Sequence, residues 1–482
     1  MNKEKRRCRK YMSVALSFLL IASGIVVFSG CANVDGNYRS GHSEGITFEF
    51  YAGPVFPLTL MEQQDSVRAT RSVNYDFSLY GSENGSGSQV TDAYTLHNAS
   101  PSDVTVTAMY PYVGSFNMEE FPVVTLNQTP VDYEIFGGEY AGGFTGGGGE
   151  SESLNLLDHR SWEDYRDMLE DGSYLSDAFS APQNLDQPAV VYKLYDIVNQ
   201  NQDAGSASLC MLLDYDSEKS TLFTFGFNGG GRQEGTEIEY RDFFIREWHD
   251  RPDWKAKYLI VLGEDINGYT LQGYQDGSCT PGEELDWPDA KVERIETTFG
   301  EALKECARIR YDAIVGNENH GGALDRYVNE KVSFEQYYGQ IIKHFMKHGP
   351  MGSEPKERYD MGIKYLDEFI LEAGTINRIL YLTFDITIPA GETVSLNIEQ
   401  LKPASYDHHH NDKEGADLNG YDMVTFLGSN LIFDRQSASI SAYDSIEIVR
   451  QNFGFDPEAG ITAVELDLNE PHYYMEIRKV KP

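Results

Sequence analysis

The chain has 482 residues, with 39 basic and 76 acidic side chains that give a formal net charge of −37 at pH 7. This balance excludes nucleic acid as a partner, because phosphates reward a basic surface, and it opposes a polybasic contact with anionic lipid. A composition that is 40% apolar and 12% aromatic is that of a folded chain, and its length indicates about two to four domains.

Residues 1–30 have the pattern of a secretory signal peptide. Six basic residues lie before position 11, an uncharged apolar stretch follows, and Cys31 comes directly after it. With Ser29 and Gly30 before the cysteine, the segment resembles the lipobox of bacterial lipoproteins, although Phe28 stands where that family usually has Leu. The resemblance implies that cleavage leaves a diacylated Cys31, which anchors the protein to the bacterial cell membrane.

The alternative is an uncleaved membrane helix, because about 20 apolar residues span a bilayer. Both interpretations place the rest of the chain outside the cytoplasm, since the basic flank stays inside. Three further cysteines, Cys210, Cys279 and Cys306, allow one disulfide at most. Cys210 and Cys306 lie among apolar residues and are predicted to be buried thiols.

Residues 31–45 show no periodicity and are predicted to form a tether. Within residues 46–135, apolar residues occupy every second position of ITFEFYA, SVNYDFSL and VTVTAMYPY, with turn clusters between them. This pattern predicts antiparallel strands with one buried face, in a β-sandwich-like region.

The glycines of residues 136–153 predict a hinge or flexible loop. A phosphate-binding loop is excluded, because no Lys-Ser or Lys-Thr follows them. Residues 154–296 are expected to be mixed and β-rich, with a short helix that starts at Ser161. The uninterrupted apolar runs LCMLL, TLFTFGF and YLIVL predict central strands buried on both faces.

Residues 297–375 change to a helical period and predict a module of three helices. Thr298 and Ser333 have the positions of caps for the first and second helices. The third helix is expected over 353–374, with Ile363 in its buried stripe.

In residues 376–482 the strand pattern resumes. The stretch ILYLTFDITI, the turn PAGE and the alternation after it predict a hairpin. This C-terminal β region would complete the N-terminal sandwich around the helices. The predicted fold is therefore α+β and mostly β, with antiparallel β-sandwich-like domains and an inserted or appended helical module.

Two clusters are candidate binding sites. In YDHHHND, the residues His408, His410 and Asp412 have the ligand types that zinc, copper or nickel prefer, although a solvated loop has the same composition. Trp248 and Trp254 would stack on sugar rings if exposed, or would otherwise pack a domain junction.

Three acidic turns resemble fragments of calcium loops, so calcium is the cofactor they would take, but none has the complete twelve-residue pattern. The residues are Asp214, Asp216 and Glu218, then Glu264, Asp265 and Asn267, and finally Asp417, Asn419 and Asp422.

The chain contains no HExxH motif of a metallohydrolase. We therefore expect a binding or structural role at the cell envelope. The protein would be attached to the membrane through its lipid and would have an envelope glycan or protein as its partner. The alternatives are a hydrolase of envelope glycans or peptides and a solute-binding lipoprotein associated with transport.

Overall fold

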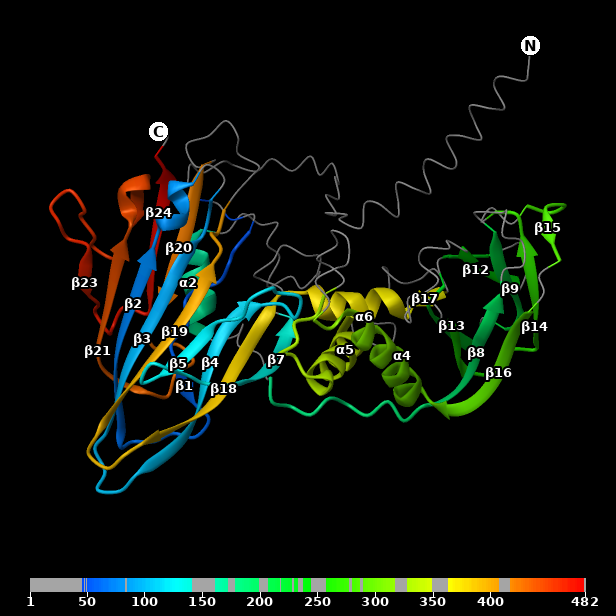
Figure 1. Ribbon diagram of the computed structural model, residues 1–482, viewed down its shortest axis with the longest axis horizontal. Coiled ribbons are helices and arrows are strands. Elements are labelled where there is room, and N and C mark those ends of the chain that lie inside the picture. Colours follow the sequence, from blue (N-terminus) through cyan, green and yellow to red (C-terminus); the bar gives the residue numbers. More distant parts are fainter. Residues whose placement is uncertain are drawn as a thin grey trace, which may run out of the picture.

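The computed structural model describes residues 46, 48, 50–82, 85–140, 161–171, 178–198, 207–216, 218–227, 229–232, 237–243, 257–276, 280–286, 289–316, 327–348, 363–406 and 417–480. The fold is α+β and mostly β, with several antiparallel sheets and few helices. Figure 1 shows an elongated molecule with a β lobe at each end and helices between them. We name the lobe built from the described residues of 46–140 and 378–480 the proximal lobe, and the lobe built from those of 188–298 with 363–365 the distal lobe.

The proximal lobe contains three sheets. The seven-stranded sheet has the order β23 (Ala463–Glu465), β21 (Ile432–Ser441), β2 (Val67–Asp76), β3 (Ser88–Asn98), β19 (Thr393–Lys402), β5 (Val123–Leu126) and β6 (Thr129–Pro130). The four-stranded sheet has the order β1 (Thr59–Leu60), β4 (Val104–Gly114), β18 (Arg378–Ile388) and β7 (Glu134–Tyr140). The three-stranded sheet has the order β20 (Leu418–Val424), β24 (His472–Lys479) and β22 (Ile446–Gln451).

The two larger sheets pack face to face because their strands alternate in polarity. In β3, Tyr94 and Leu96 are buried, whereas Thr95 between them is exposed. Tyr94 and Leu96 belong to the same apolar cluster as Ala108 of β4 and Leu382 of β18. The alternation in the sequence therefore decides which face of each strand meets the opposite sheet.

Strands from the two ends of the chain lie next to each other in both larger sheets. β2 pairs in parallel with β21, β3 pairs antiparallel with β19, and β4 pairs antiparallel with β18. The proximal lobe is therefore built jointly by residues 59–140 and 378–479.

The predicted hairpin of β18 and β19 is wrong. β18 pairs with β4 and β7, whereas β19 pairs with β3 and β5, so the PAGE turn crosses between two sheets. The β3–β4 connection makes the same crossing, and the buried side-chain amide of Asn98 donates to the main-chain oxygens of Ser102 and Ile388. The alternation of apolar and polar residues identifies the buried face of a strand, but it does not determine which strand pairs with it.

The expected glycine-rich hinge also begins too early. Residues 136–140 belong to β7, where Phe136 and Gly137 pair with β18. The edge of β18 offers unpaired main-chain N–H and C=O groups to residues 136–140, and the glycines in this segment do not prevent the pairing. Residues 141–153 lie outside the described part.

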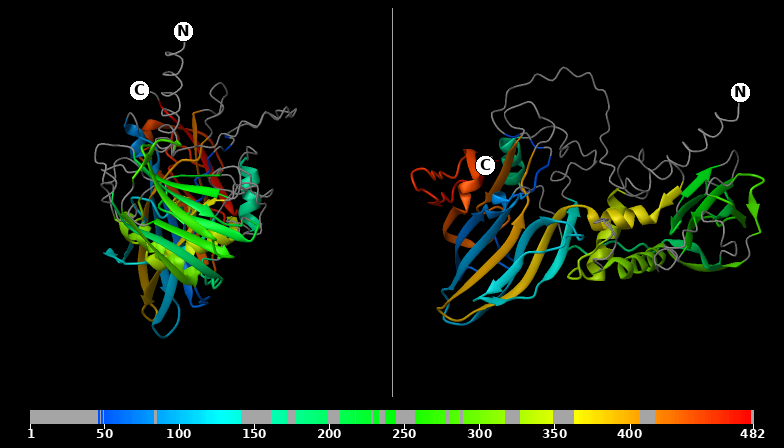
Figure 2. Two further views of the ribbon diagram at one scale, coloured as in Figure 1. Left: turned by 90° about the vertical axis from the view of Figure 1, so that its right-hand side faces the viewer. Right: turned by 45° about the horizontal axis from the view of Figure 1, so that its top comes forward.

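The distal lobe consists of two five-stranded sheets. The first has the order β16 (Asp289–Thr298), β8 (Pro188–Val198), β13 (Lys257–Gly263), β10 (Ser220–Phe225) and β17 (Ile363–Tyr365). The second has the order β11 (Gly229–Arg232), β12 (Glu237–Phe243), β9 (Ser208–Asp214), β14 (Gly268–Tyr274) and β15 (Glu284–Leu285). The left view of Figure 2 looks onto this lobe. β9, β10 and β13 lie inside their sheets and are largely buried, which confirms the prediction from their apolar runs.

The helices are α2 (Trp162–Asp171), α4 (Phe299–Ile314), α5 (Phe334–His348) and α6 (Leu366–Thr375). The predicted caps are confirmed, since Thr298 Oγ1 accepts from the Glu301 amide and Ser333 Oγ from the Gln336 amide, both at 3.3 Å. The third helix is shorter than predicted, because it begins at Leu366. Residues 363–365 pair in parallel with β10 instead, where the sheet edge supplies hydrogen-bond partners that a helix start lacks.

One apolar cluster runs from the proximal lobe through the helices into the distal lobe. It includes Phe384 of β18, Phe345 of α5 and Phe223 of β10, as well as Cys306 of α4. Cys306 and Cys210 are buried, as predicted, whereas Cys279 lies outside the described residues. Among the described residues, no helix combines the length and apolarity that crossing a membrane would require.

Candidate functional site

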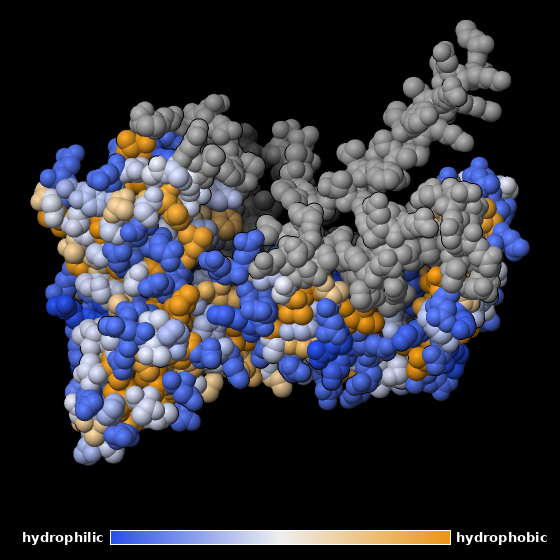
Figure 3. Space-filling view, viewed as in Figure 1, coloured by the Kyte–Doolittle hydropathy of each residue, from blue (hydrophilic) through white to orange (hydrophobic). Residues whose placement is uncertain are grey.

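A groove lies between α4 and the strands β8 and β16 of the distal lobe, and we call it the α4 groove. Its cavity has a volume of about 410 Å³, within the range of small-ligand sites. In the space-filling view of the molecule, hydrophobic residues appear as scattered patches among hydrophilic ones (Figure 3). The α4 groove combines apolar and charged side chains, the composition of many ligand sites.

The floor of the α4 groove is apolar. Alternation along β8 directs Val191 toward α4 and its neighbour Tyr192 into the core between the two distal sheets. Val191 pairs with Ile295 of β16, which places both side chains on the same face of the sheet. Ala302 of α4 and Phe334 of α5 complete the floor.

The rim of the groove carries charge. Glu301, Lys304, Glu305 and Arg308 line it, and their spacing of three and four residues places them on one face of α4. The cap at Thr298 starts the helix immediately after β16, so α4 packs near its own strand and near β8.

Glu305 is held by two donors. The Tyr258 hydroxyl donates to Glu305 Oε1 at 2.7 Å and Lys193 Nζ at 3.0 Å. Partial burial acts to raise the pKa of Glu305, but these hydrogen bonds outweigh it and the net effect lowers the pKa. The carboxylate of Glu305 therefore stays ionised and is compensated by Lys193.

The two cations of the rim are less engaged. The guanidinium carbon of Arg308 lies 3.2 Å from the ring centroid of Phe334, so the group is stacked on the ring. Its ion contact with Asp312 is long, at 3.8 Å between exposed side chains. Lys304 Nζ lies 5.9 Å from the ring of Tyr338, and no described carboxylate is within ion-pair distance of it.

This arrangement suits recognition better than hydrolysis. A glycoside hydrolase needs one protonated carboxyl group and a second carboxylate across the scissile bond. In the α4 groove, Glu305 has a lowered pKa, and Glu301 lies one turn away on the same helix. The groove offers instead an apolar floor, a stacked guanidinium and an ammonium group.

The residues that sequence motifs single out as binding candidates fall outside the described part of the chain, and so does the lipidation candidate. These residues are Cys31, Trp248, Trp254, His408, His410 and Asp412.

Two of the three acidic turns come together, with a lysine between them. Lys219 Nζ lies 3.1 Å from Asp216 and 3.3 Å from Glu264, and Asn267 donates to Asp214 at 3.2 Å. Within the described ranges, no three His, Cys, Asp or Glu side chains form a group that could hold a metal ion. Protein cations and amides therefore engage these turns.

The third acidic motif is divided between the surface and the core. Asp417 pairs with Arg478 at the surface, whereas Asp422 is buried. Asp422 Oδ2 accepts from the Tyr51 hydroxyl at 2.5 Å and lies 2.8 Å from His472 Nε2. This buried pair resembles a catalytic dyad, but its side chains are only 1% exposed and offer no access to a substrate.

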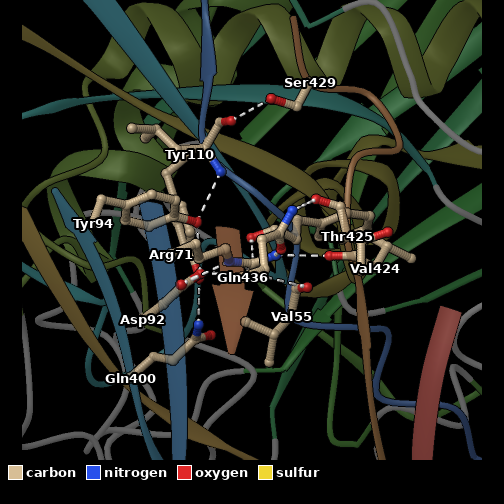
Figure 4. A network of polar contacts seen from close by, with 12 residues as sticks. Val55, Arg71, Asp92, Tyr94, Tyr110, Gln400, Val424, Thr425, Ser429 and Gln436 are labelled. Atoms are coloured by element: carbon tan, nitrogen blue, oxygen red, sulfur yellow. Dashed lines mark hydrogen bonds and ion pairs between the residues drawn. The ribbon is translucent and has the colours of Figure 1, made fainter. Parts of the chain in front are cut away.

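A second buried polar network joins the seven-stranded sheet to the segments that cross it (Figure 4). Arg71 donates to both oxygens of Asp92, at 2.8 and 2.9 Å, and to the carbonyl oxygen of Val424 at 2.7 Å. The hydroxyls of Tyr94 and Tyr110 also donate to Asp92, at 2.8 and 3.3 Å. Arg71 and Asp92 have side chains with no exposure, so this network fixes structure and does not meet a ligand.

The α4 groove is absent from the candidates that the sequence motifs supply. One signal was present, because Glu301, Lys304, Glu305 and Arg308 follow a helical period opposite the buried stripe of α4. The contribution of Val191 could not be inferred, since it lies more than one hundred positions earlier and approaches α4 only through strand pairing.

No protein-family model matches the chain, and no curated protein matches it.

Proposed function

We propose that the protein is a lipid-anchored extracytoplasmic binding protein that recognises its ligand in the α4 groove. The observation that carries this proposal is the groove itself, which combines an apolar floor with the stacked guanidinium of Arg308 and the ammonium group of Lys304. Its position adds to the argument, because it lies on the distal lobe.

The chain enters the described fold in the proximal lobe. The amide of Ile46 donates to Glu476 of β24 at 3.3 Å, and Ile46 is buried in the cluster around Trp162. A lipid on Cys31, joined to Ile46 by a short tether, would keep the proximal lobe beside the membrane. The distal lobe, which lies at the other end of the molecule (Figure 1), would then lie farther from the membrane.

The anchor is tested by replacing Cys31 with Ser, using Cys8→Ser as the matched control in the same leader. We expect the wild type and the Cys8→Ser variant to fractionate with membranes and to carry the mass of a lipidated cysteine. The Cys31→Ser variant is expected to lose the lipid. A wild-type protein without lipid would contradict the anchor.

The recognition role is tested by sedimenting the soluble part, residues 32–482, with cell envelopes. We expect the protein to be retained by the envelopes. Thr297→Glu should reduce this retention, because it adds a carboxylate to the groove. Thr297→Gln adds a side chain of the same shape as Glu without the charge and should leave retention unchanged. Release of soluble glycan or peptide fragments that Glu305→Gln abolishes would contradict recognition and support the hydrolase.

A further inference from the structure

The lining of the α4 groove has an excess of cations over unpaired carboxylates, within a strongly acidic protein. The charge of Glu305 is compensated by Lys193 Nζ at 3.0 Å. Among the lining residues, two cations, Lys304 and Arg308, then remain with one carboxylate, Glu301. Asp312 lies outside the lining, at 3.8 Å from Arg308. The chain as a whole has a formal charge of −37, so this local excess is a property of the site and not of the surface in general.

The two cations are placed to act together. Lys304 and Arg308 are one helical turn apart, which brings residues on one face within about 5–6 Å at their β-carbons. Stacking on Phe334 fixes the plane of the Arg308 guanidinium, and its N–H edge has only a long ion contact, at 3.8 Å to Asp312. An edge of this kind matches the two oxygens of a carboxylate, and an ammonium group can add a further hydrogen bond.

The rest of the groove selects the body of the ligand. Val191, Ile295 and Ala302 supply an apolar floor, and the cavity of about 410 Å³ accommodates a small group. An apolar body buried there would gain the hydrophobic free energy of transfer from water. The charge balance favours a single negative charge, since Glu301 offsets one of the two cations and would repel a dianion such as phosphate.

We propose that the α4 groove binds a monocarboxylate with an apolar body, supplied as a small free acid or as the C-terminal end of a peptide. The proposal rests on the recognition role of the groove and names the chemical class of its ligand. The carboxylate contacts Lys304 and Arg308, and the apolar body lies on Val191 and Ile295.

The test measures binding of three probes of one shape to the soluble protein by titration calorimetry at fixed ionic strength. Phenylbutyrate carries the carboxylate, phenylbutanol is neutral and phenylbutylamine is a cation. We expect phenylbutyrate to bind roughly ten- to hundredfold more tightly than phenylbutanol, the range of a charge-assisted hydrogen bond. Equal binding of the acid and the alcohol, or preference for the amine, would overturn the proposal.

Variants locate the binding. Arg308→Gln and Thr297→Glu are each expected to weaken phenylbutyrate binding about tenfold or more. Thr297→Gln is the control for Thr297→Glu. Lys331→Gln is the control for a lost cation, because Lys331 also lies over a ring, that of Tyr133 at 4.6 Å, but does not line the groove. Equal loss in both control variants would show that the effect is general and would overturn the assignment to the groove.

A second arm separates the two sources of the carboxylate. A peptide that ends in Leu-Phe is compared with the same peptide amidated at its C-terminus. Binding of the free-acid peptide alone supports a peptide terminus as the ligand, and binding of phenylbutyrate but neither peptide supports a small acid. Failure of all carboxylates, with envelope retention intact, would overturn this proposal while leaving the recognition role standing.

Discussion

At the scale of single residues, buried charge in the proximal lobe is stabilised in two ways. Arg71 has the carboxylate of Asp92 as its partner, whereas Lys402 and Arg378 meet mainly neutral oxygens. Lys402 Nζ donates to the carbonyls of Ala52 and Pro54, and Arg378 donates to Gln340 and to the carbonyl of Ala373. Burial lowers the pKa of Lys402 to about 8 and that of Arg378 to about 10.

The lowered pKa of Lys402 predicts that stability increases with pH in the alkaline range. The unfolded chain, with the ordinary lysine pKa of 10.5, binds the proton more strongly than the folded protein does. The free energy of unfolding should therefore rise by about 1 kcal/mol between pH 7 and pH 9. The Lys402→Met variant lacks this titration. Urea denaturation of both proteins at the two pH values measures the difference, and parallel behaviour would contradict the prediction.

The Arg71–Asp92 pair predicts an asymmetry between single and double substitutions. Asp92→Asn leaves a buried guanidinium without its anion and should lower the free energy of unfolding by about 3–5 kcal/mol. The double variant Arg71→Met, Asp92→Leu removes both charges and should lose less. Urea denaturation of the three proteins decides the matter, and a double variant that is less stable than Asp92→Asn would argue against the prediction.

At the scale of elements, α2 depends on one glycine of the sheet beneath it. Trp162 of α2 stacks on Tyr474 at 5.1 Å between ring centroids and donates to Glu476 at 2.8 Å. Gly420 of β20 lies under the indole, where an added β-carbon would be 2.7 Å from Trp162 Cζ2. No real packing tolerates that distance, so the absence of a side chain at position 420 allows the helix to dock.

We predict that Gly420→Ala displaces α2 and accelerates amide exchange in residues 163–171, because the indole can no longer reach Glu476. Gly268→Ala is the matched control, since a β-carbon at that position meets nothing within 4 Å. Exchange measured by mass spectrometry should change in the first variant alone. Unchanged exchange in Gly420→Ala would show that the sheet shifts to accommodate the methyl group, and it would contradict the prediction.

The elements differ in how far the sequence determines them. The caps at Thr298 and Ser333 were predictable, because a cap is a contact between residues three positions apart. The partner of β18 was not, because β4 and β19 both offer a complementary apolar face and only the packed sandwich distinguishes them. The α4 groove has the same limitation. Its rim is local to one helix, but its floor comes from strands that are distant in sequence.

At the scale of the whole molecule, the proximal lobe requires both ends of the chain. β3 lies between β2 and β19, and β4 lies between β1 and β18. A fragment of residues 46–140 would lack β18, β19 and β21 and would expose the apolar faces that those strands cover.

We therefore predict that this fragment shows little amide protection by itself, and that adding residues 376–482 as a second chain restores protection in β3 and β4. Hydrogen exchange followed by NMR measures both. The distal strands and helices are absent from this pair of fragments, so the result reports on the proximal sheets alone. Strong protection in the isolated fragment would contradict the joint construction of the lobe.

The pairing of β2 with β21 has a consequence for the order of events during synthesis. Arg68 and Asp434, which are hydrogen-bonded across these strands, are 366 positions apart in the chain. Closing so long a loop is slow, and an unpaired strand edge invites association with other chains while it waits. β2 is thus synthesised early but pairs with β21 only near the end of synthesis. During most of that time one edge of β2 is unpaired and prone to aggregation, and a chaperone can shield it.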